Sequence, residues 1–206
     1  MIHKANACKK GTVINMKRYD LKRFINPEIL KTERLTLRKM VQSDLDDVYE
    51  YASCPEVSEY LLWLPHPDKA FTKSYLKNIE KKYKLAEFYD YAIEYRGKMI
   101  GTVGFTSLYP EHQRAEIGFV LNKSYWGMGL GREAAERLIK YGFEVLELER
   151  IEALFIDGNE RSERLLHSLG MQKEGTLKSY MQVKGRARDI SIAAITKDTY
   201  TRSAKK

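Results

Sequence analysis

Glycines alternate at positions 127, 129 and 131, directly before an amphipathic pattern that runs to about Leu146. Because glycine has no Cβ, a ligand can approach its backbone closely and φ can become positive without a steric cost. The helix that follows offers unpaired N–H groups and the positive end of its dipole. The pattern therefore predicts a cradle for phosphate groups, although a turn that only starts a helix would use the same glycines.

The residues around these glycines limit the classes of ligand that the glycines can bind. A dinucleotide fingerprint needs its glycines directly after a buried strand, whereas residues 122–125 separate the strand-like run 115–121 from Gly127. A P-loop needs Lys-Ser or Lys-Thr after its last glycine, and Arg132-Glu133 stands there. The sequence thus indicates a phosphate-bearing ligand that is neither a bound dinucleotide nor a hydrolysed nucleotide.

The segments 116–121 and 125–134 together resemble the acetyl-CoA site of the GNAT N-acetyltransferase superfamily. They are most similar to the branch that contains the ribosomal-protein N-terminal alanine and serine acetyltransferases. Further segments resemble that branch in the same register, so the resemblance spans residues 31–199. These segments are 32–38, 159–162 with 169–171, and 174–177 with Asp189.

The hydrophobic patterns predict an α+β fold, independently of that resemblance. The patterns alone indicate a sheet of mixed strand direction with helices inserted between some of its strands. The resemblance implies a GNAT-like, mixed, mostly antiparallel sheet of about seven strands flanked by helices. The expected strands are 34–40, 88–95, 99–108, 114–121, 150–156, 171–183 and 188–195, and the expected helices are 43–49, 70–85, 132–146 and 160–169. Ser43 is the expected cap of the first helix, and the second carries an apolar stripe of Phe71, Tyr75, Ile79 and Tyr83.

With 206 residues and no break in composition, the chain fits one domain. We expect a basic N-terminal extension over 1–30, a single N-acetyltransferase domain over 31–199 and a basic tail over 200–206. Met16 is a second candidate start, in which case the first fifteen residues are not native. A monomer or a homodimer fits equally well.

The net charge of +8 is spread along the chain, so direct nucleic-acid binding is not expected. Cys8 and Cys54 have no paired spacing and the four histidines are scattered, so neither a disulfide nor a metal is expected. Residues 1–30 lack an apolar run that could span a membrane or act as a secretory signal. A cytoplasmic protein without a membrane partner is the expectation.

The resemblance implies acetyl-CoA as co-substrate. The backbone around the glycines would then hold its pyrophosphate, an outward-facing strand edge would pair with the pantetheine arm, and an asparagine would hydrogen-bond that arm. The residues implied are Phe119, Val120, Leu121, Gly127, Met128, Gly129, Leu130, Gly131, Arg132 and Asn159.

Family resemblance also implies direct attack of an amine on the thioester, with Glu116 as general base or ammonium-steering carboxylate. A strand glutamate that faces solvent or pairs with Arg114 is the alternative, and Glu94 is the runner-up for the base. An α-amino group titrates about 2.5 units below a lysine, so a weak base suffices for a peptide N-terminus.

The general acid departs from the commonest family pattern. A tyrosine often stands seven residues after the asparagine, but that position is Leu166, which has no proton to donate. In the ribosomal-protein branch a serine three residues after the asparagine is the suggested donor, and Ser162 matches it. For Ser162 and Asn159 alike, a helix cap is the structural alternative.

The expected acceptor is a protein N-terminal α-amine, of a ribosomal or another protein. Two alternatives stay open, namely a small amine such as a polyamine, amino sugar or antibiotic, and a non-catalytic CoA-binding module. Residues 60–85 should shape the acceptor site, but their aromatic side chains do not distinguish peptides from small molecules.

Overall fold

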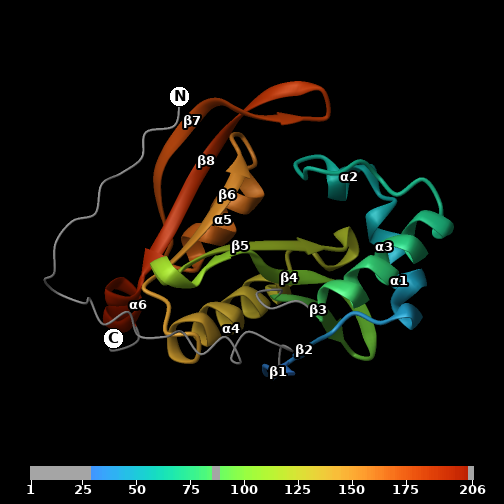
Figure 1. Cartoon of the computed structure of the whole chain (residues 1–206), viewed down its shortest axis with the longest axis horizontal. Coiled ribbons are helices and arrows are strands. Elements are labelled where there is room, and N and C mark those ends of the chain that lie inside the picture. The colour runs from blue at the N-terminus through green and yellow to red at the C-terminus, as the bar shows by residue number, and fades with distance from the viewer. Residues whose placement is uncertain (1–28, 85–88, 204–206) are drawn as a thin grey trace, which may run out of the picture.

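The computed structural model describes residues 29–84 and 89–203, and within them eight strands form one sheet (Figure 1). The order across the sheet is β1-β2-β3-β4-β5-β6-β8-β7, and every neighbouring pair is antiparallel except β5–β6. The strands are β1 Leu30–Lys31, β2 Leu35–Arg38, β3 Tyr89–Tyr95, β4 Lys98–Tyr109, β5 Arg114–Leu121, β6 Arg150–Ile156, β7 Gln172–Val183 and β8 Arg186–Thr196. The predicted α+β, mostly antiparallel architecture is confirmed, and the two-residue β1 is the strand beyond the expected seven.

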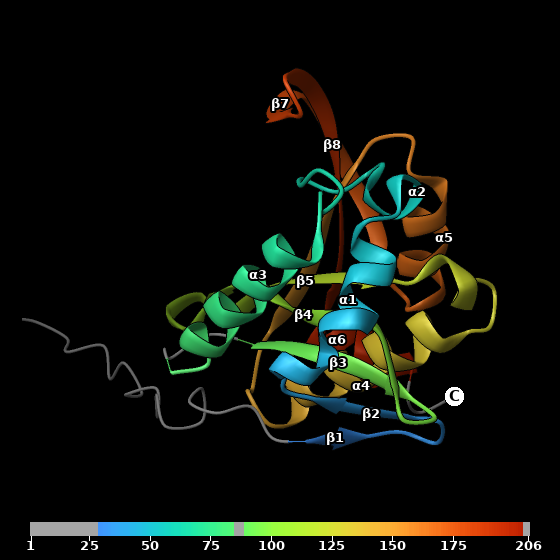
Figure 2. The same ribbon diagram turned by 90° about the vertical axis from the view of Figure 1, so that its right-hand side faces the viewer.

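Helices cover both faces of the sheet (Figures 1 and 2). The α-helices are α1 Leu45–Ala52, α2 Pro55–Ser58, α3 Lys69–Lys82, α4 Leu130–Glu144, α5 Glu160–Ser168 and α6 Lys197–Ser203, and the 3-10 turns are η2 Gln42–Asp44, η3 Pro110–His112 and η4 Lys123–Tyr125. One face packs on α4, whose side chains Ala135, Leu138 and Ile139 are buried as the sequence predicts. The other face packs on α1 and α3 through a second apolar cluster.

The first two predicted helices begin and pack differently from the expectation. Ser43 lies inside the turn η2, and Asp44 takes the N-cap position of α1, where its carboxylate also binds Arg38. In α3 the buried stripe is Thr72, Leu76, Ile79 and Tyr83, and Phe71 is 51% exposed. Phe71 and Tyr75 line a cleft, and Tyr75 also packs against the second apolar cluster.

The sequence did not predict α2 or α6. Proline at the first position starts α2, which is only one turn long and so has no measurable apolar period. In α6, Tyr200 stacks on Phe143 of α4 with ring centroids 4.9 Å apart. The expected domain end at residue 199 therefore falls inside a helix.

The only parallel contact among the described strands is short. β5 and β6 pair over Arg114–Glu116 and Arg150–Glu152, and then diverge. Because Ile117–Leu121 of β5 pairs with β4 alone, its other edge is free of sheet partners. This divergence opens the sheet in its middle.

Candidate active site

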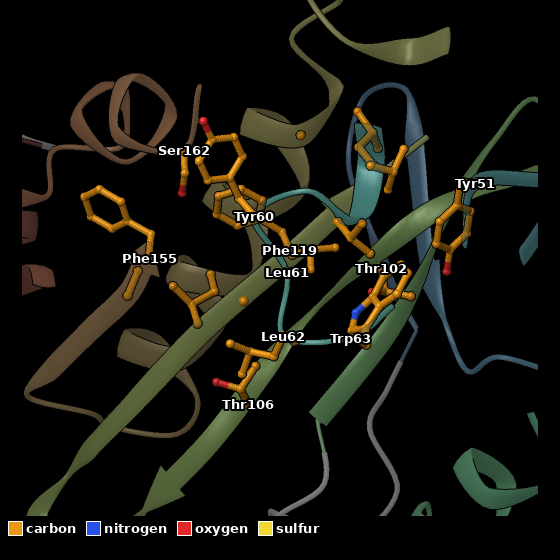
Figure 3. A pocket seen from close by; sticks show the side chains of 18 of the residues that line it. Tyr51, Tyr60, Leu61, Leu62, Trp63, Thr102, Thr106, Phe119, Phe155 and Ser162 are labelled. Carbon is orange, nitrogen blue, oxygen red and sulfur yellow. The ribbon is translucent and has the colours of Figure 1, made fainter. Parts of the chain in front are cut away.

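A cleft of about 1950 Å³ crosses the sheet where β5 and β6 diverge. Figure 3 shows it running from Ser162 and Phe155 on one side to Tyr51 on the other, with Phe119 and Thr102 between them. The part against residues 119–132 and 159–162 is called the glycine end below. The part against Tyr51, residues 63–75 and Asp90 is called the aromatic end.

Backbone conformation at the glycine end requires glycine at two positions. Gly127 and Gly129 have φ of +77° and +75°, and Gly129 is the N-cap of α4. The first helical hydrogen bond runs from the Glu133 N–H to the Gly129 carbonyl. Within the described residues the N–H groups of 127–132 make no hydrogen bond outside the helix ladder, so they remain for an anion at the helix N-terminus.

Glu133 holds this turn in place from the first turn of α4. Its carboxylate accepts hydrogen bonds from the Thr32 hydroxyl and from the Arg34 backbone N–H, and binds the Arg34 guanidinium at 2.6 Å. Arg34 in turn donates to the Met128 carbonyl at 3.0 Å. Burial raises the pKa of the Glu133 carboxyl, but these hydrogen bonds outweigh it and leave the pKa below its usual value.

The edge of β5 offers backbone groups at alternate residues. Asn122 N–H donates to the Ile100 carbonyl on β4, so by alternation Val120 also faces β4, while Phe119 and Leu121 face the open side. Trp126 Nε1 already donates to the Leu121 carbonyl at 2.8 Å. Of the three residues expected to pair with pantetheine, Phe119 therefore has both backbone groups open, and Val120 contributes only its side chain to the cleft wall.

Asn159 and Ser162 lie together at the start of α5, and both line the cleft. The Asn159 side-chain oxygen accepts from the Ser162 N–H at 3.2 Å, so Asn159 is the cap. Because Asn159 takes that role, the Ser162 hydroxyl is not used as a cap. Among the residues that the structure describes, this hydroxyl has no hydrogen-bond partner and is available to a ligand.

Glu116 lies on the cleft face of β5, since its neighbours Ala115 and Ile117 are buried on the α4 face. Burial raises the pKa of its carboxyl, a hydrogen bond with Thr106 acts against this, and Glu152 raises the pKa further. The alternative pairing with Arg114 is not formed, because Arg114 binds Glu152 instead. Glu116 therefore faces the cleft as a half-buried carboxylate with weakened acidity.

The other candidates from the sequence lie elsewhere. Glu94 binds Arg38 at 2.6 Å and does not line the cleft. Cys54 does not line the cleft either, and its thiol donates to the carboxylate of Glu56, which does. A nucleophilic Cys54 would need a histidine base beside it. His66 lines the cleft, but its Nδ1 lies 2.9 Å from the Thr72 hydroxyl and Cys54 is not its hydrogen-bond partner. Cys8 lies outside the described residues.

A hydrogen bond between α2 and the β7–β8 turn bounds the cleft beside β6, β7 and β8. Lys184, in the turn between β7 and β8, donates to the Ser58 carbonyl at the end of α2 with a distance of 2.6 Å. Figure 1 shows this hairpin curving toward α2. Tyr60 packs against an apolar cluster of β6, β7 and β8 residues. The cleft is thus bounded on this side by a hydrogen-bonded link between α2 and the hairpin.

The chain belongs to the GNAT acetyltransferase family, because the family model for the acetyltransferase (GNAT) domain matches residues 34–172. The uncharacterized N-acetyltransferase p20 of Bacillus licheniformis is 39% identical over 175 residues, 84% of this chain and 98% of that protein. The crystal structure of a GNAT-family acetyltransferase from Bacillus anthracis matches with a TM-score of 0.73 and 28% identity, over 83% of this chain and 99% of that one. The protein is thus an N-acetyltransferase of a family that uses acetyl-CoA.

Relatives with named acceptors differ from one another. The spermidine N(1)-acetyltransferase of Escherichia coli is 27% identical over 80% of this chain and 87% of its own length. The ribosomal protein uS5 alanine N-acetyltransferase of the same species is 31% identical over 50% of this chain and 54% of its own length. The family assignment therefore leaves the acceptor class open.

Two kinds of feature are absent from the part of the chain that the structure describes. In 29–84 and 89–203 no group of three or more His, Cys, Asp or Glu side chains could hold a metal ion. No helix in this part of the chain combines the length and the apolar character needed to cross a bilayer.

Proposed function

We propose that the protein transfers the acetyl group of acetyl-CoA to the α-amine of a protein or peptide N-terminus. One observation carries the proposal, namely that Glu116 and the unbonded Ser162 hydroxyl line the same cleft as the N–H groups at the start of α4. These N–H groups and the dipole of a 15-residue helix suit a pyrophosphate. The open backbone of Phe119 suits the amides of a pantetheine arm as an added strand would.

In the proposed reaction the amine nitrogen attacks the thioester carbonyl carbon, and the C–S bond breaks as the C–N bond forms. Before the attack, the acceptor ammonium gives one proton to Glu116, directly or through water, so that the attacking nitrogen is neutral. The nitrogen loses its second proton to water as the C–S bond breaks, while Ser162 donates a proton to the departing thiolate and regains one from water. The products are an acetylated amine and free CoA. The weakened acidity of Glu116 fits this role, because a general base works best with a pKa near the working pH.

Two features favour an N-terminus over an internal lysine. The link between Lys184 and Ser58 encloses the cleft, so a chain end enters it more readily than the middle of a folded segment. An α-amine also needs less help to lose its proton, since its pKa lies near 7.7–8.0 against about 10.4 for lysine. A single half-buried carboxylate is enough to deprotonate an α-amine.

The proposal is tested by offering acetyl-CoA with a panel of short peptides and amines, and locating the acetyl group by mass spectrometry. We expect acetylation at the α-nitrogen, and loss of turnover when that nitrogen is blocked. Acetylation only of lysine side chains or of small amines would contradict the acceptor assignment. CoA binding without any turnover across the panel would favour the non-catalytic module.

A further inference from the structure

The aromatic end of the cleft contains a carboxylate that the proposed reaction does not use. Asp90 of β3 lines the cleft, and its strand neighbours Tyr91 and Ile93 are buried on the α4 face. Asp90 therefore points to the opposite face, as Ala92 does, toward α1 and α3. In the described residues its carboxyl has no hydrogen bond or ion pair.

Three tyrosine side chains lie near this carboxylate. Tyr51 of α1 and Tyr75 of α3 line the same part of the cleft, and Tyr83 donates to the Asp90 backbone carbonyl at 2.6 Å. Burial is the main cause of the raised pKa of all three phenols, and the charge of Asp90 raises each further. The phenols therefore lie within electrostatic range of the carboxylate.

Asp90 and Glu116 lie on the same face of the sheet, and the residues between them are glycines, which have no side chains. Asp90 stands opposite Gly104, and Gly104 opposite Gly118, in neighbouring strands. A Cβ on Gly118 would lie 2.6 Å from the Thr106 side chain, so this face is packed to the glycine backbone. Two strand spacings and two residues along β5 separate Asp90 from Glu116, which places their Cα atoms about 12 Å apart.

A partly buried carboxylate without a partner destabilises a protein, and a positively charged ligand removes that cost. Burial raises the pKa of Asp90 to about 7, and the charge of Lys82 at the outer rim acts against this. Aromatic rings beside a carboxylate also favour an alkylammonium group through cation–π attraction. The pocket around Asp90 thus combines the two features that bind organic cations.

We propose that Asp90, with the rings of Tyr51 and Tyr75, binds a second positive charge of the acceptor, separate from the amine that is acetylated. The inference rests on the proposed function for the position of the reacting amine. The chemical class is a primary alkylammonium about 10 Å from that amine, which an extended peptide of about three residues spans. A lysine near the acceptor N-terminus and the far end of an α,ω-diamine share this chemistry.

The test compares matched acceptors in the wild-type protein, in Asp90→Asn and in Glu80→Gln. The last variant removes the same charge from α3 at an exposed position outside the cleft. The acceptors are 1,8-diaminooctane against octylamine, and alanyl-lysyl-alanine against its norleucine analogue. Steady-state kinetics with acetyl-CoA give KM and kcat, and calorimetry on the CoA-loaded protein gives binding without turnover.

We expect the wild-type protein to prefer the dication of each pair, and Asp90→Asn to raise the KM for dications about tenfold with little change for monocations. Glu80→Gln should match the wild type. Preference within the peptide pair identifies a lysine as the source, and preference within the amine pair a diamine. Equal use of both members by the wild type, or an equal loss for both in Asp90→Asn, would overturn the inference.

Failure of the proposed function would look different. If no acceptor is acetylated but calorimetry shows binding of 1,8-diaminooctane that Asp90→Asn weakens, the subsite stands and the reaction does not. If binding is also independent of Asp90, the subsite is wrong. Turnover that does not depend on Asp90 leaves the reaction in place and removes only the subsite.

Discussion

The two ends of the cleft offer a ligand different kinds of chemical group. At the glycine end the groups available to a ligand are backbone N–H and carbonyl groups at Phe119 and at 127–132, held by glycine conformations and by Glu133. At the aromatic end they are the side chains of Tyr51, Tyr75 and Asp90. A backbone site suits one invariant ligand such as the co-substrate. A side-chain site can be changed residue by residue, which suits an acceptor that differs among relatives.

The largest expected effect is at the glycine end, in Gly129→Val. A β-branched side chain at φ +75° is strained and would block the N–H groups that we propose to bind the pyrophosphate. We expect CoA affinity to fall about 100-fold or more, measured by calorimetry. Gly97→Val is the matched control, because Gly97 has φ of +78° in the β3–β4 turn with no atom near its Cβ position. Equal CoA affinity in the two variants would show that the glycine end does not bind CoA through its backbone.

The second effect concerns Glu116→Gln, which lies between the ends. Loss of the base should lower kcat/KM about 100-fold near neutral pH while leaving CoA affinity nearly unchanged. The raised pKa of Glu116 means that wild-type activity falls as pH drops through that pKa, since the carboxylate becomes protonated. The variant should lack this acidic limb and recover in part at high pH, where free amine is abundant. A pH profile equal to that of the wild type would assign the base elsewhere.

Ser162→Ala should have a smaller effect. The hydroxyl caps nothing, because Asn159 caps α5, so the helix should keep its stability. We expect kcat to fall about tenfold, less than a fully required acid would give, since a thiolate leaves without protonation at moderate cost. Thermal unfolding of the variant is the control, and a lower Tm with unchanged kcat would assign Ser162 a structural role instead.

The smallest effect is on stability, at the aromatic end. The folded-state pKa of Asp90, about 7, lies above its unfolded value. The folded state therefore loses stability relative to the unfolded state as pH rises from about 4 to 7, as the carboxyl ionises. Asp90→Asn should raise the unfolding free energy by about 1 kcal/mol at pH 8 and change it little at pH 4, by chemical denaturation. If Asp90→Asn changes the unfolding free energy equally at both pH values, the Asp90 carboxylate is not an unpaired charge in the folded protein.

The same contrast explains what the sequence could predict. The glycine end lies in one contiguous segment, 125–134, so its position and the helix after it could be predicted from the chain alone, although that helix begins at Leu130 rather than at Arg132. Asn159 and Ser162 followed from the resemblance, although only the structure resolves which of them is the cap. Strand edges such as Arg114–Leu121 were predicted to the residue, because alternation and flanking polar residues define them.

The aromatic end could not be predicted in this way. Asp90, Tyr51 and Tyr75 come from three elements that only the sheet register and the packing of α1 and α3 bring together. Phe71 and Tyr75 have the spacing of a core stripe, and nothing local distinguishes an apolar face that lines a cleft from one that is buried. Glu94, the alternative base, is taken by Arg38, a partner 56 residues away.

The short contact between β5 and β6 has a mechanical consequence. Among the described strands, β5 and β6 pair over only three residues each. This pairing is the sheet contact between the β1–β5 portion and the portion made of β6, β8 and β7. A ligand that contacts both the open edge of β5 and the start of α5 would hold the two portions of the sheet together. It would therefore couple their unfolding. Amide exchange in β6 and β8 should then slow when CoA is added, and the protein should change from uncoupled to cooperative opening.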